Sequence, residues 1–462
     1  MSRRVVITGL GPVTAFGVGI EPLWKALLDG RSAIAPITRF NASGFPCSLG
    51  AELPEDKFNI RDVVPKSYRK ATKVMCRDIE LAVAAAAAAI SDAGLVTRAA
   101  EDAGTVTVPP HRMGCHIGAG LIAADVDELT AALATSRKTV ASGQLSAVGA
   151  KTDSGSVADE PWAMDEVDLA EWGRAGMENL TPLWLLKYLP NMLACHVTII
   201  HDCQGPSNTI TCCEASSGLS LGESVRVIAR DRADACLTGG AEFKLNPMAF
   251  YRQHAAGRLA PTSDEAARAV KPFDPSANGT VLGEGGGILI VEEREHALAR
   301  GAKMYAEVAG FASTQSICRN NLTFDFDPED HGISDAMENA IAQAGITPAQ
   351  IDAIAPFGSG IPNVDQAEAA AIRRVFGARA ASIPLITTVP NTGNCNAGNG
   401  AIALIAAAKA IETQQLPARI NTTAAQGLDA NACPARPARL DYVLVSSTSQ
   451  GGQNAAIVLR RV

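Results

Sequence analysis

Two stretches that lie far apart in the chain repeat one order of elements, and this repetition is the strongest constraint on the fold. Residues 5–11 (VVITGLG) are typical of a buried strand that ends in glycine, an alanine-rich helix is predicted over 78–94, and residues 112–120 (RMGCHIGAG) predict a second strand. Residues 333–360 repeat the helix, its stop, the strand and the glycine-rich end. We therefore predict an internally duplicated α/β protein, with helices covering each sheet and one helix layer between them.

The predicted halves extend over residues 1–270 and 271–462, with an insertion at about 135–180. Because alanine occupies every face of the helix over 78–94, we expect that helix to lie in the centre of the protein. Within the insertion, residues 153–178 hold eight acidic residues and one arginine, which favours a solvated surface excursion. A lid that binds a partner is the alternative.

Composition excludes several classes of function. The net charge of −8 argues against a nucleic-acid partner, because such binding relies on neutralising phosphates. The 11 cysteines form no CxxC pair and no histidine is spaced to complete a zinc site, so we expect no metal, reduced thiols and a cytoplasmic location. The longest apolar run has about ten residues, whereas a membrane helix needs roughly 18, so we expect no membrane span.

The segment over residues 195–242 is the most informative for chemistry. Its pattern predicts a strand, a turn, a second strand, a helix and a further strand, with His196 and His201 as structural residues flanking the first strand. An abrupt passage from strand to helix places one side chain at the helix N-terminus, where free N–H groups favour an anion. Glu214 stands at that bend.

The sequence GPSNTITCCEASSGLSLG (205–222) resembles the nucleophile elbow of the β-ketoacyl-acyl carrier protein synthases, which have the thiolase fold. Further similarity lies in VVITGLGPVT at the start, LTGGAE (237–242), KPFDPSANGTVLGEGGG (271–287) and GGQN (451–454). The resemblance therefore covers nearly the whole chain. It implies a thiolase-like α/β fold with a duplicated, five-layered αβαβα core.

The same resemblance implies that the residues of condensation are replaced. Counting from the GPS motif and back from Gly222 puts Glu214 at the position of the family's catalytic cysteine. The family's two histidine motifs correspond to FGSGIPNVD (357–365) and VPNTGNCNAGNGA (389–401). The replacements are Glu214 for the cysteine, Phe357 and Asn394 for the two histidines, Val389 for the lysine, and Gln450 for the phenylalanine at the gate and oxyanion position.

These replacements make condensation by this chain alone improbable. The reaction needs a thiolate to accept the acyl chain and imidazoles to stabilise the enolate, whereas an acyl-glutamate would be a mixed anhydride that water destroys. We interpret Glu214 as a carboxylate that caps the following helix and closes an unused pocket. The other interpretation rests on relatives with glutamine at this position, namely chain-length-factor subunits and decarboxylase domains. Cys213 would need a bulge to enter the pocket, because neighbouring side chains of a strand face opposite sides.

A basic segment, RDVVPKSYRKATKVMCR (61–77), resembles the family's docking site for the acyl carrier protein. On an acidic protein, this cationic patch suits the acidic recognition helix of a carrier. A solvated helix face is the alternative. We expect no resident cofactor, since phosphopantetheine would arrive on the carrier. The predicted docking residues are Arg61, Lys66, Arg69, Lys70 and Lys73.

Three functions follow from the resemblance. The first is a companion subunit similar to a chain length factor, which pairs with an active ketosynthase beside residues 195–210; a homodimer is the other arrangement. The second is an enzyme in its own right, either a malonyl-carrier decarboxylase or an acyl-thioester enzyme with Glu214 as base, Asn394 as donor and the Glu214 and Gln450 N–H groups as oxyanion hole. The third is a homodimeric synthase that uses Cys213.

Overall fold

The computed structural model describes every residue except 1–2, 101–103, 136–167, 181–182, 321–324, 327–329 and 426. It contains two compact units, one made of residues 1–122 and 189–462 and the other of residues 123–188. The predicted insertion falls largely in the smaller unit, and its residues 136–167 lie outside the described part. The smaller unit contains helices α4 (Val126–Thr135) and α5 (Leu169–Arg174), and Lys187 and Tyr188 both bind Glu128.

The larger unit is built on one hydrogen-bonded path of strands. Their bounds are β1 Val5–Thr14, β5 Met113–Gly118, β6 Ser207–Ile210, β7 Ala235–Glu242, β9 Gly285–Glu293, β10 Ala306–Gln315, β13 Ala353–Ala355, β16 Tyr442–Thr448 and β17 Gln453–Arg460. The order is β13-β16-β17-β10-β1-β9-β7-β5-β6, with the short β2 (Gly17–Val18) paired to β1. Strand β1 pairs with β10 in antiparallel register, Val6 opposite Glu307. Strand β9, which falls in the predicted second half, pairs with β1 and β7 of the predicted first half.

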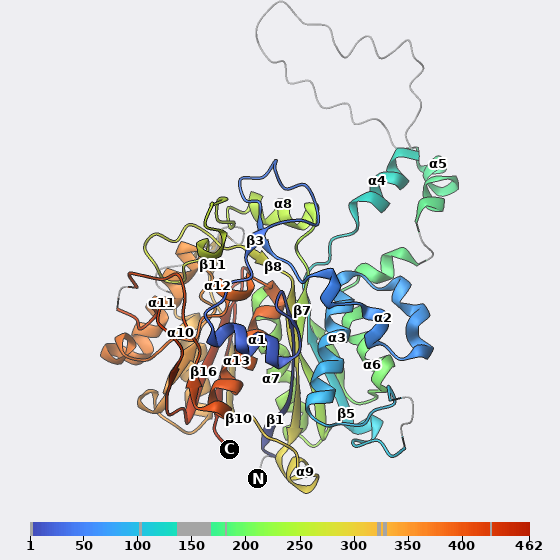
Figure 1. The fold of residues 1–462 in the computed structure, drawn as a ribbon. Coiled ribbons are helices and arrows are strands. Elements are labelled where there is room, and N and C mark those ends of the chain that lie inside the picture. The colour runs from blue at the N-terminus through green and yellow to red at the C-terminus, as the bar shows by residue number, and fades with distance from the viewer. Residues whose placement is uncertain are drawn as a thin grey trace, which may run out of the picture. The chain divides into compact units, whose positions relative to one another are not determined.

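Helices lie on both faces of each half of this path (Figure 1). Their bounds are α3 Arg77–Asp92, α6 Met192–His201, α7 Ser216–Ala229, α10 Gly332–Gln343, α11 Pro362–Phe376 and α13 Asn399–Thr413. Gly9 and Gly11 of β1 face α3, where an added Cβ would overlap helix backbone, whereas Leu10 packs in the apolar cluster that contains α13. The second half repeats this arrangement, because Gly310 of β10 meets α10 and Phe311 meets α7. The predicted αβαβα layering is confirmed.

The alanine-rich helix α3 does not lie in the centre, so that prediction is wrong. The small alanine side chains allow this helix to lie close to the glycines of β1 on one face. Helix α6 covers another part of it. The enclosed helix is α13, in which every residue from Asn399 to Ile411 is buried. Alanine on every face therefore indicates that other elements pack closely around a helix. An outer helix that is itself covered by another helix also meets this condition.

The segment predicted as the first strand of the elbow region is instead helix α6. His196 and His201 lie inside it, buried, where His196 Nδ1 is hydrogen-bonded to Tyr68 Oη at 2.9 Å and His201 Nδ1 to Thr97 Oγ1 at 2.9 Å. The structural role expected for both histidines fits these bonds. Periodicity does not separate a short apolar run in a helix from one in a strand, which explains the error. The helix ends at His201, and the next residue, Asp202, has a left-handed φ of 56°.

The remaining elements of the elbow region follow the prediction. Strand β6 leads into the elbow, α7 follows it, and β7 succeeds α7. Gly222 of α7 lies so close to the Phe311 ring that an added Cβ would overlap it, which is the close helix packing that the glycine indicates. Among the described residues, no helix combines the length and the apolar character that crossing a bilayer requires.

Candidate functional site

The elbow is a single turn, η7 (Cys213–Ala215), between β6 and α7. Cys213 has a φ of 46°, a left-handed conformation that reverses the chain just before the helix begins at Ser216. The turn is fixed by the Cys212 N–H, which donates to Ser216 Oγ at 2.8 Å, and by Ser217 Oγ, which donates to the carbonyl of Ala397. The side chain of Glu214 is fully buried at this bend, as the sequence pattern predicts.

Glu214 does not cap helix α7. Its carboxylate forms an ion pair with Arg258, and it accepts the N–H of Gln450 at 3.3 Å. Helix α7 has no side-chain cap. The capping interpretation is therefore wrong, because a buried guanidinium, rather than the helix amides, satisfies the charge.

Arg258 is the functional residue that the sequence analysis missed. It follows helix α8 (Pro247–Ala255) and is 2% exposed. Besides Glu214, its Nη1 donates to Gln253 Oε1 at 2.8 Å and to Gln450 Oε1 at 3.1 Å. No pattern in HAAGRLA marks this arginine, because its partner is 44 positions away and only the fold brings them together.

The ion pair changes the electrostatics expected of the elbow. Each oxygen of the Glu214 carboxylate is held by a donor, one by Arg258 and the other by Gln450 N–H. The neighbouring guanidinium offsets the negative charge that would repel an acidic substrate. The Gln450 N–H already donates to Glu214, so it is not free to form an oxyanion hole in this arrangement.

Phe357 and Val389 come together in an apolar cluster. Phe357 is 4% and Val389 1% exposed, and both pack with Phe250 and Val364. The Phe357 and Gly358 N–H groups bind the two oxygens of Glu368 at 2.9 and 3.0 Å, and burial raises the pKa of this carboxyl to about 7. The two side chains at the family's histidine and lysine positions thus offer no polar atom to a ligand.

The Asn394 side chain is fully buried, and hydrogen bonds hold its oxygen atom. Its Oδ1 accepts the Asn396 N–H at 2.8 Å and the Asn399 side-chain amide at 2.5 Å. Within the described residues, its Nδ2 has no hydrogen-bond partner. The turn η11 (Asn396–Gly398) packs against η7, so this segment borders the elbow.

A cavity of about 400 Å³ lies beside the elbow. Most of the surface exposed in the cavity is apolar, although many of the lining residues are polar: Cys213, Glu242, Lys244, Tyr251, Arg252, Gln253, Arg258, Asn396 and Gln450. Glu242 and Lys244 form a second ion pair within this wall. The site therefore combines a chamber of mainly apolar surface with two ion pairs, Glu214–Arg258 and Glu242–Lys244.

Cys213 lines this cavity, contrary to the expectation that it faces away. The left-handed backbone at this residue breaks the alternation of a strand, so the residue lines the cavity while it stays exposed. Burial, together with the negative charges of Glu214 and Glu242, raises the pKa of the Cys213 thiol to about 12. A thiol is present, but its surroundings disfavour the thiolate that a nucleophile requires.

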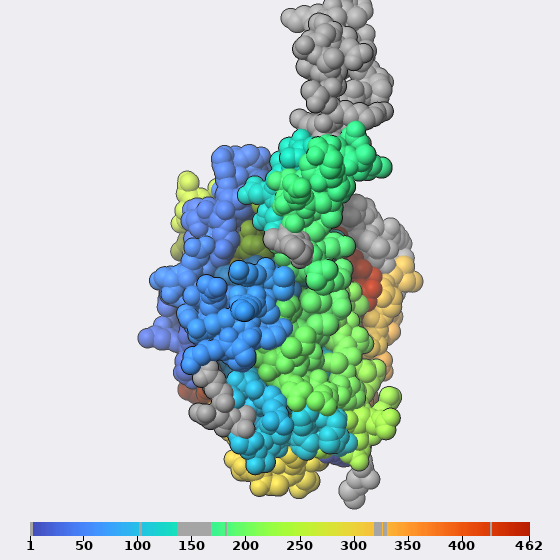
Figure 2. All heavy atoms as spheres, turned by 90° about the vertical axis from the view of Figure 1, so that its right-hand side faces the viewer, coloured from blue at the N-terminus to red at the C-terminus, as the bar shows by residue number. Residues whose placement is uncertain are grey.

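The basic segment is exposed beside helix α6. It comprises α2 (Ile60–Val63) and the turn η2 (Lys66–Val74), and the bond between Tyr68 and His196 fastens it to α6. Figure 2 shows this blue surface next to the green one of α6. All five cations predicted for docking are exposed here: Arg61, Lys66, Arg69, Lys70 and Lys73.

Sequence comparison matches residues 2–297 to the β-ketoacyl synthase N-terminal domain and residues 305–423 to its C-terminal domain. The 3-oxoacyl-(acyl-carrier-protein) synthase 2 of Coxiella burnetii is 32% identical over 466 residues, covering 100% of this chain and 99% of the relative. The synthase of the same name from a Synechocystis strain is 30% identical over 463 residues, covering 99% and 98%.

Solved structures agree with these matches. The ishigamide ketosynthase/chain length factor superposes with a TM-score of 0.78 at 26% identity, and a β-ketoacyl synthase from Burkholderia phymatum with 0.78 at 25%, each covering 100% of both chains. The two matched domains account for most of the chain and extend through both halves of the duplicated fold. This chain belongs to the β-ketoacyl synthase family.

Proposed function

We propose that this chain is a ketosynthase-like subunit that does not condense acyl groups by itself and pairs with an active ketosynthase, in the manner of a chain length factor. The observation that carries the proposal is the Glu214–Arg258 ion pair at the elbow. It fills the nucleophile's position with a neutralised side chain and ties the Gln450 loop to it. The likeness to the ishigamide ketosynthase/chain length factor supports this proposal.

The surroundings of the elbow favour the same conclusion. Phe357 and Val389 are buried among apolar side chains, and neither can stabilise an enolate. The Cys213 thiol keeps its proton far above neutral pH. A chain of this kind retains the fold and a chamber, which are what a companion subunit contributes to a shared acyl channel.

We propose that the partner binds at β6 and α6. Strand β6 is the edge of the sheet path, and its first two residues are exposed. An edge strand offers unpaired backbone groups to another chain. Ile199 of α6 is 63% exposed beside this edge, which suits a partner that covers apolar surface.

Co-expression with a complete ketosynthase from the same organism tests the proposal. We expect the two chains to co-purify in a 1:1 ratio and the pair to extend an acyl chain, whereas this chain alone does not. Ile199→Glu should abolish the pairing. Ile317→Glu is the matched control, since Ile317 is 65% exposed in the other half of the fold. Condensation by the isolated chain, or pairing that Ile199→Glu leaves intact, contradicts the proposal.

A second function is favoured by one observation, the unpartnered Nδ2 of the buried Asn394 beside the elbow. Such an amide can donate to a thioester oxygen, so the chain could decarboxylate a malonyl group carried on an acyl carrier protein. Purified protein incubated with malonyl-carrier would then release carbon dioxide and form acetyl-carrier. Asn394→Asp removes the N–H donor and should abolish the release of carbon dioxide. Release that persists in this variant would contradict the role of Asn394.

A further inference from the structure

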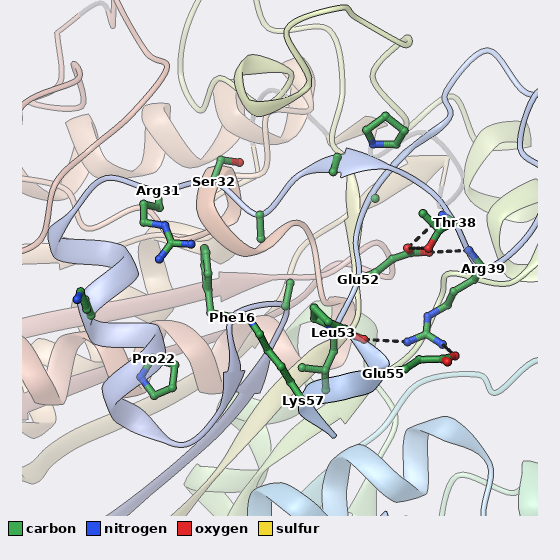
Figure 3. A pocket seen from close by; sticks show the side chains of 17 residues that line it. Phe16, Pro22, Arg31, Ser32, Thr38, Arg39, Glu52, Leu53, Glu55 and Lys57 are labelled. Atoms are coloured by element: carbon green, nitrogen blue, oxygen red, sulfur yellow. Dashed lines mark hydrogen bonds and ion pairs between the residues drawn. The ribbon is translucent and has the colours of Figure 1, made fainter. Parts of the chain in front are cut away.

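A second cavity, of about 770 Å³, shares no lining residue with the cavity beside Glu214. It lies among helix α1 (Ile20–Leu28), strands β3 (Ala35–Pro36) and β4 (Leu49–Ala51), and the turn η1 (Glu55–Lys57), as Figure 3 shows. Its volume is within the range of small-ligand sites.

Three cations at this cavity have no counter-ion among the residues that the structure describes. Lys25 comes from α1, Arg31 from the segment that follows it, and Lys57 from η1. In the part of the chain that the structure describes, none of these three side chains has an ion pair or a hydrogen bond, and all are exposed. The Arg31 guanidinium lies 5.6 Å from the centre of the Phe16 ring, which holds it against the wall.

The acidic side chains of the cavity are engaged at the opposite end. Glu52 accepts the N–H groups of Thr38 and Arg39, and Glu55 lies 3.8 Å from Arg39. Figure 3 shows this group on the side away from Arg31 and Phe16. The acids are thus held by other protein groups, whereas the Arg31 side chain, against Phe16, lies away from them and free of any such contact among the described residues.

The backbone that carries Arg31 is fixed. Asn391 Nδ2 donates to the Arg31 carbonyl at 2.7 Å, Ser32 Oγ donates to the Pro390 carbonyl at 2.7 Å, and the Ala33 N–H donates to the Asn391 carbonyl at 2.8 Å. These bonds attach the rim to helix α12 (Val389–Thr392), which is buried. Because this rim is already ordered, a ligand that binds here would not have to offset the free-energy cost of ordering it.

We propose that this cavity binds a small phosphate-bearing molecule, with its phosphate between Lys25, Arg31 and Lys57 and its apolar part against Phe16, Pro22 and Leu53. The planar guanidinium matches phosphate oxygens in pairs, and the two ammonium groups add point charges. The apolar residues of the wall give the rest of the ligand a surface to cover.

Isothermal titration of the purified full chain with inorganic pyrophosphate at constant ionic strength tests the site. We expect saturable binding with one site per chain. Arg31→Gln and Lys57→Gln should each weaken it by about tenfold, since each removes a charged contact. The matched control is Lys70→Gln, an exposed cation of the docking segment that does not line this cavity, and it should leave binding unchanged.

Three outcomes overturn the proposal. Absence of saturable binding removes it, and an equal loss with Lys70→Gln reduces the effect to general attraction by surface cations. Saturation of the cavity by an acidic peptide but not by pyrophosphate assigns it to a macromolecular partner instead. Because all three substituted side chains are exposed, thermal melting without ligand should be unchanged in the variants, which separates lost binding from lost folding.

Discussion

Arg258 is the counter-ion of Glu214, and neither side chain has appreciable contact with water, being 2% and 0% exposed. Removing one partner leaves the other charge buried and uncompensated. We expect Glu214→Ala and Arg258→Ala each to lower the free energy of unfolding by about 3–5 kcal/mol, measured by urea denaturation.

The double variant Glu214→Gln/Arg258→Gln removes both charges and keeps polar side chains of similar reach. We expect it to recover much of the stability that either alanine variant loses, because no charge then remains buried. The cycle is completed by the single variants Glu214→Gln and Arg258→Gln, and losses from these two that simply add in the double variant would show that the two residues act independently.

Restoring sulfur at the elbow is not expected to restore condensation. Glu214→Cys/Arg258→Leu supplies a thiol without leaving a buried guanidinium, but Phe357 and Asn394 remain at the positions that the resemblance assigns to imidazoles. The expected result is no 3-oxoacyl product above background from acyl- and malonyl-carrier, measured by mass spectrometry. Product from this variant would mean that other groups of the cavity stabilise the enolate.

The position of Glu214 could be predicted from sequence because local rules decide it. A strand, a sharp turn and a helix follow one another within a few residues, which puts a single side chain at the bend. The layering was predictable too, because two stretches of the chain repeat one order of strand and helix and the resemblance covers nearly the whole chain.

The contacts of the site were not predictable from sequence. Arg258 reaches Glu214 only through the fold, and the position of Cys213 at the cavity depends on one left-handed backbone angle. Helix α6 has an apolar run that fits a strand equally well. Errors arose where long-range contacts or a single dihedral angle, rather than periodicity, decided the outcome.

The thiol of Cys213 should be accessible but slow to react. Its pKa of about 12 leaves roughly one thiolate in ten thousand at pH 8, so alkylation by iodoacetamide should be far slower than for free cysteine. The rate should rise about tenfold per pH unit while the protein stays folded. Peptide mapping, with Cys213→Ala as control, measures it. Rapid labelling at pH 7 would contradict the raised pKa.

Acyl carrier protein should bind through the basic segment if the proposed function holds. Arg69→Glu/Lys70→Glu reverses two exposed charges, and we expect affinity for a holo carrier to fall by about tenfold or more at low salt, with a weaker dependence on salt. Arg268→Glu is the control, since Arg268 is an exposed cation outside the segment. Surface plasmon resonance measures both. Equal losses in the two variants would indicate only a general effect of charge.

Asp78, in the first turn of α3, should make stability depend on pH. Burial raises the pKa of this carboxyl to about 7, with Glu242 raising it further and Lys244 opposing the rise. Between about pH 4 and 7 the unfolded chain releases this proton while the folded chain keeps it, so the folded state binds more protons and the free energy of unfolding falls as pH rises.

Asp78→Asn keeps an oxygen for the Phe243 N–H, which the carboxyl accepts at 3.0 Å, and removes the titration. Relative to wild type, the variant should therefore gain stability with rising pH, by at most about 1.4 kcal/mol per unit in this window, with the gain levelling off above about pH 7. Urea denaturation at intervals from pH 4 to 8 measures the difference. A stability difference between variant and wild type that is constant with pH, or that shrinks as pH rises, contradicts a protonated Asp78 in the first turn of α3.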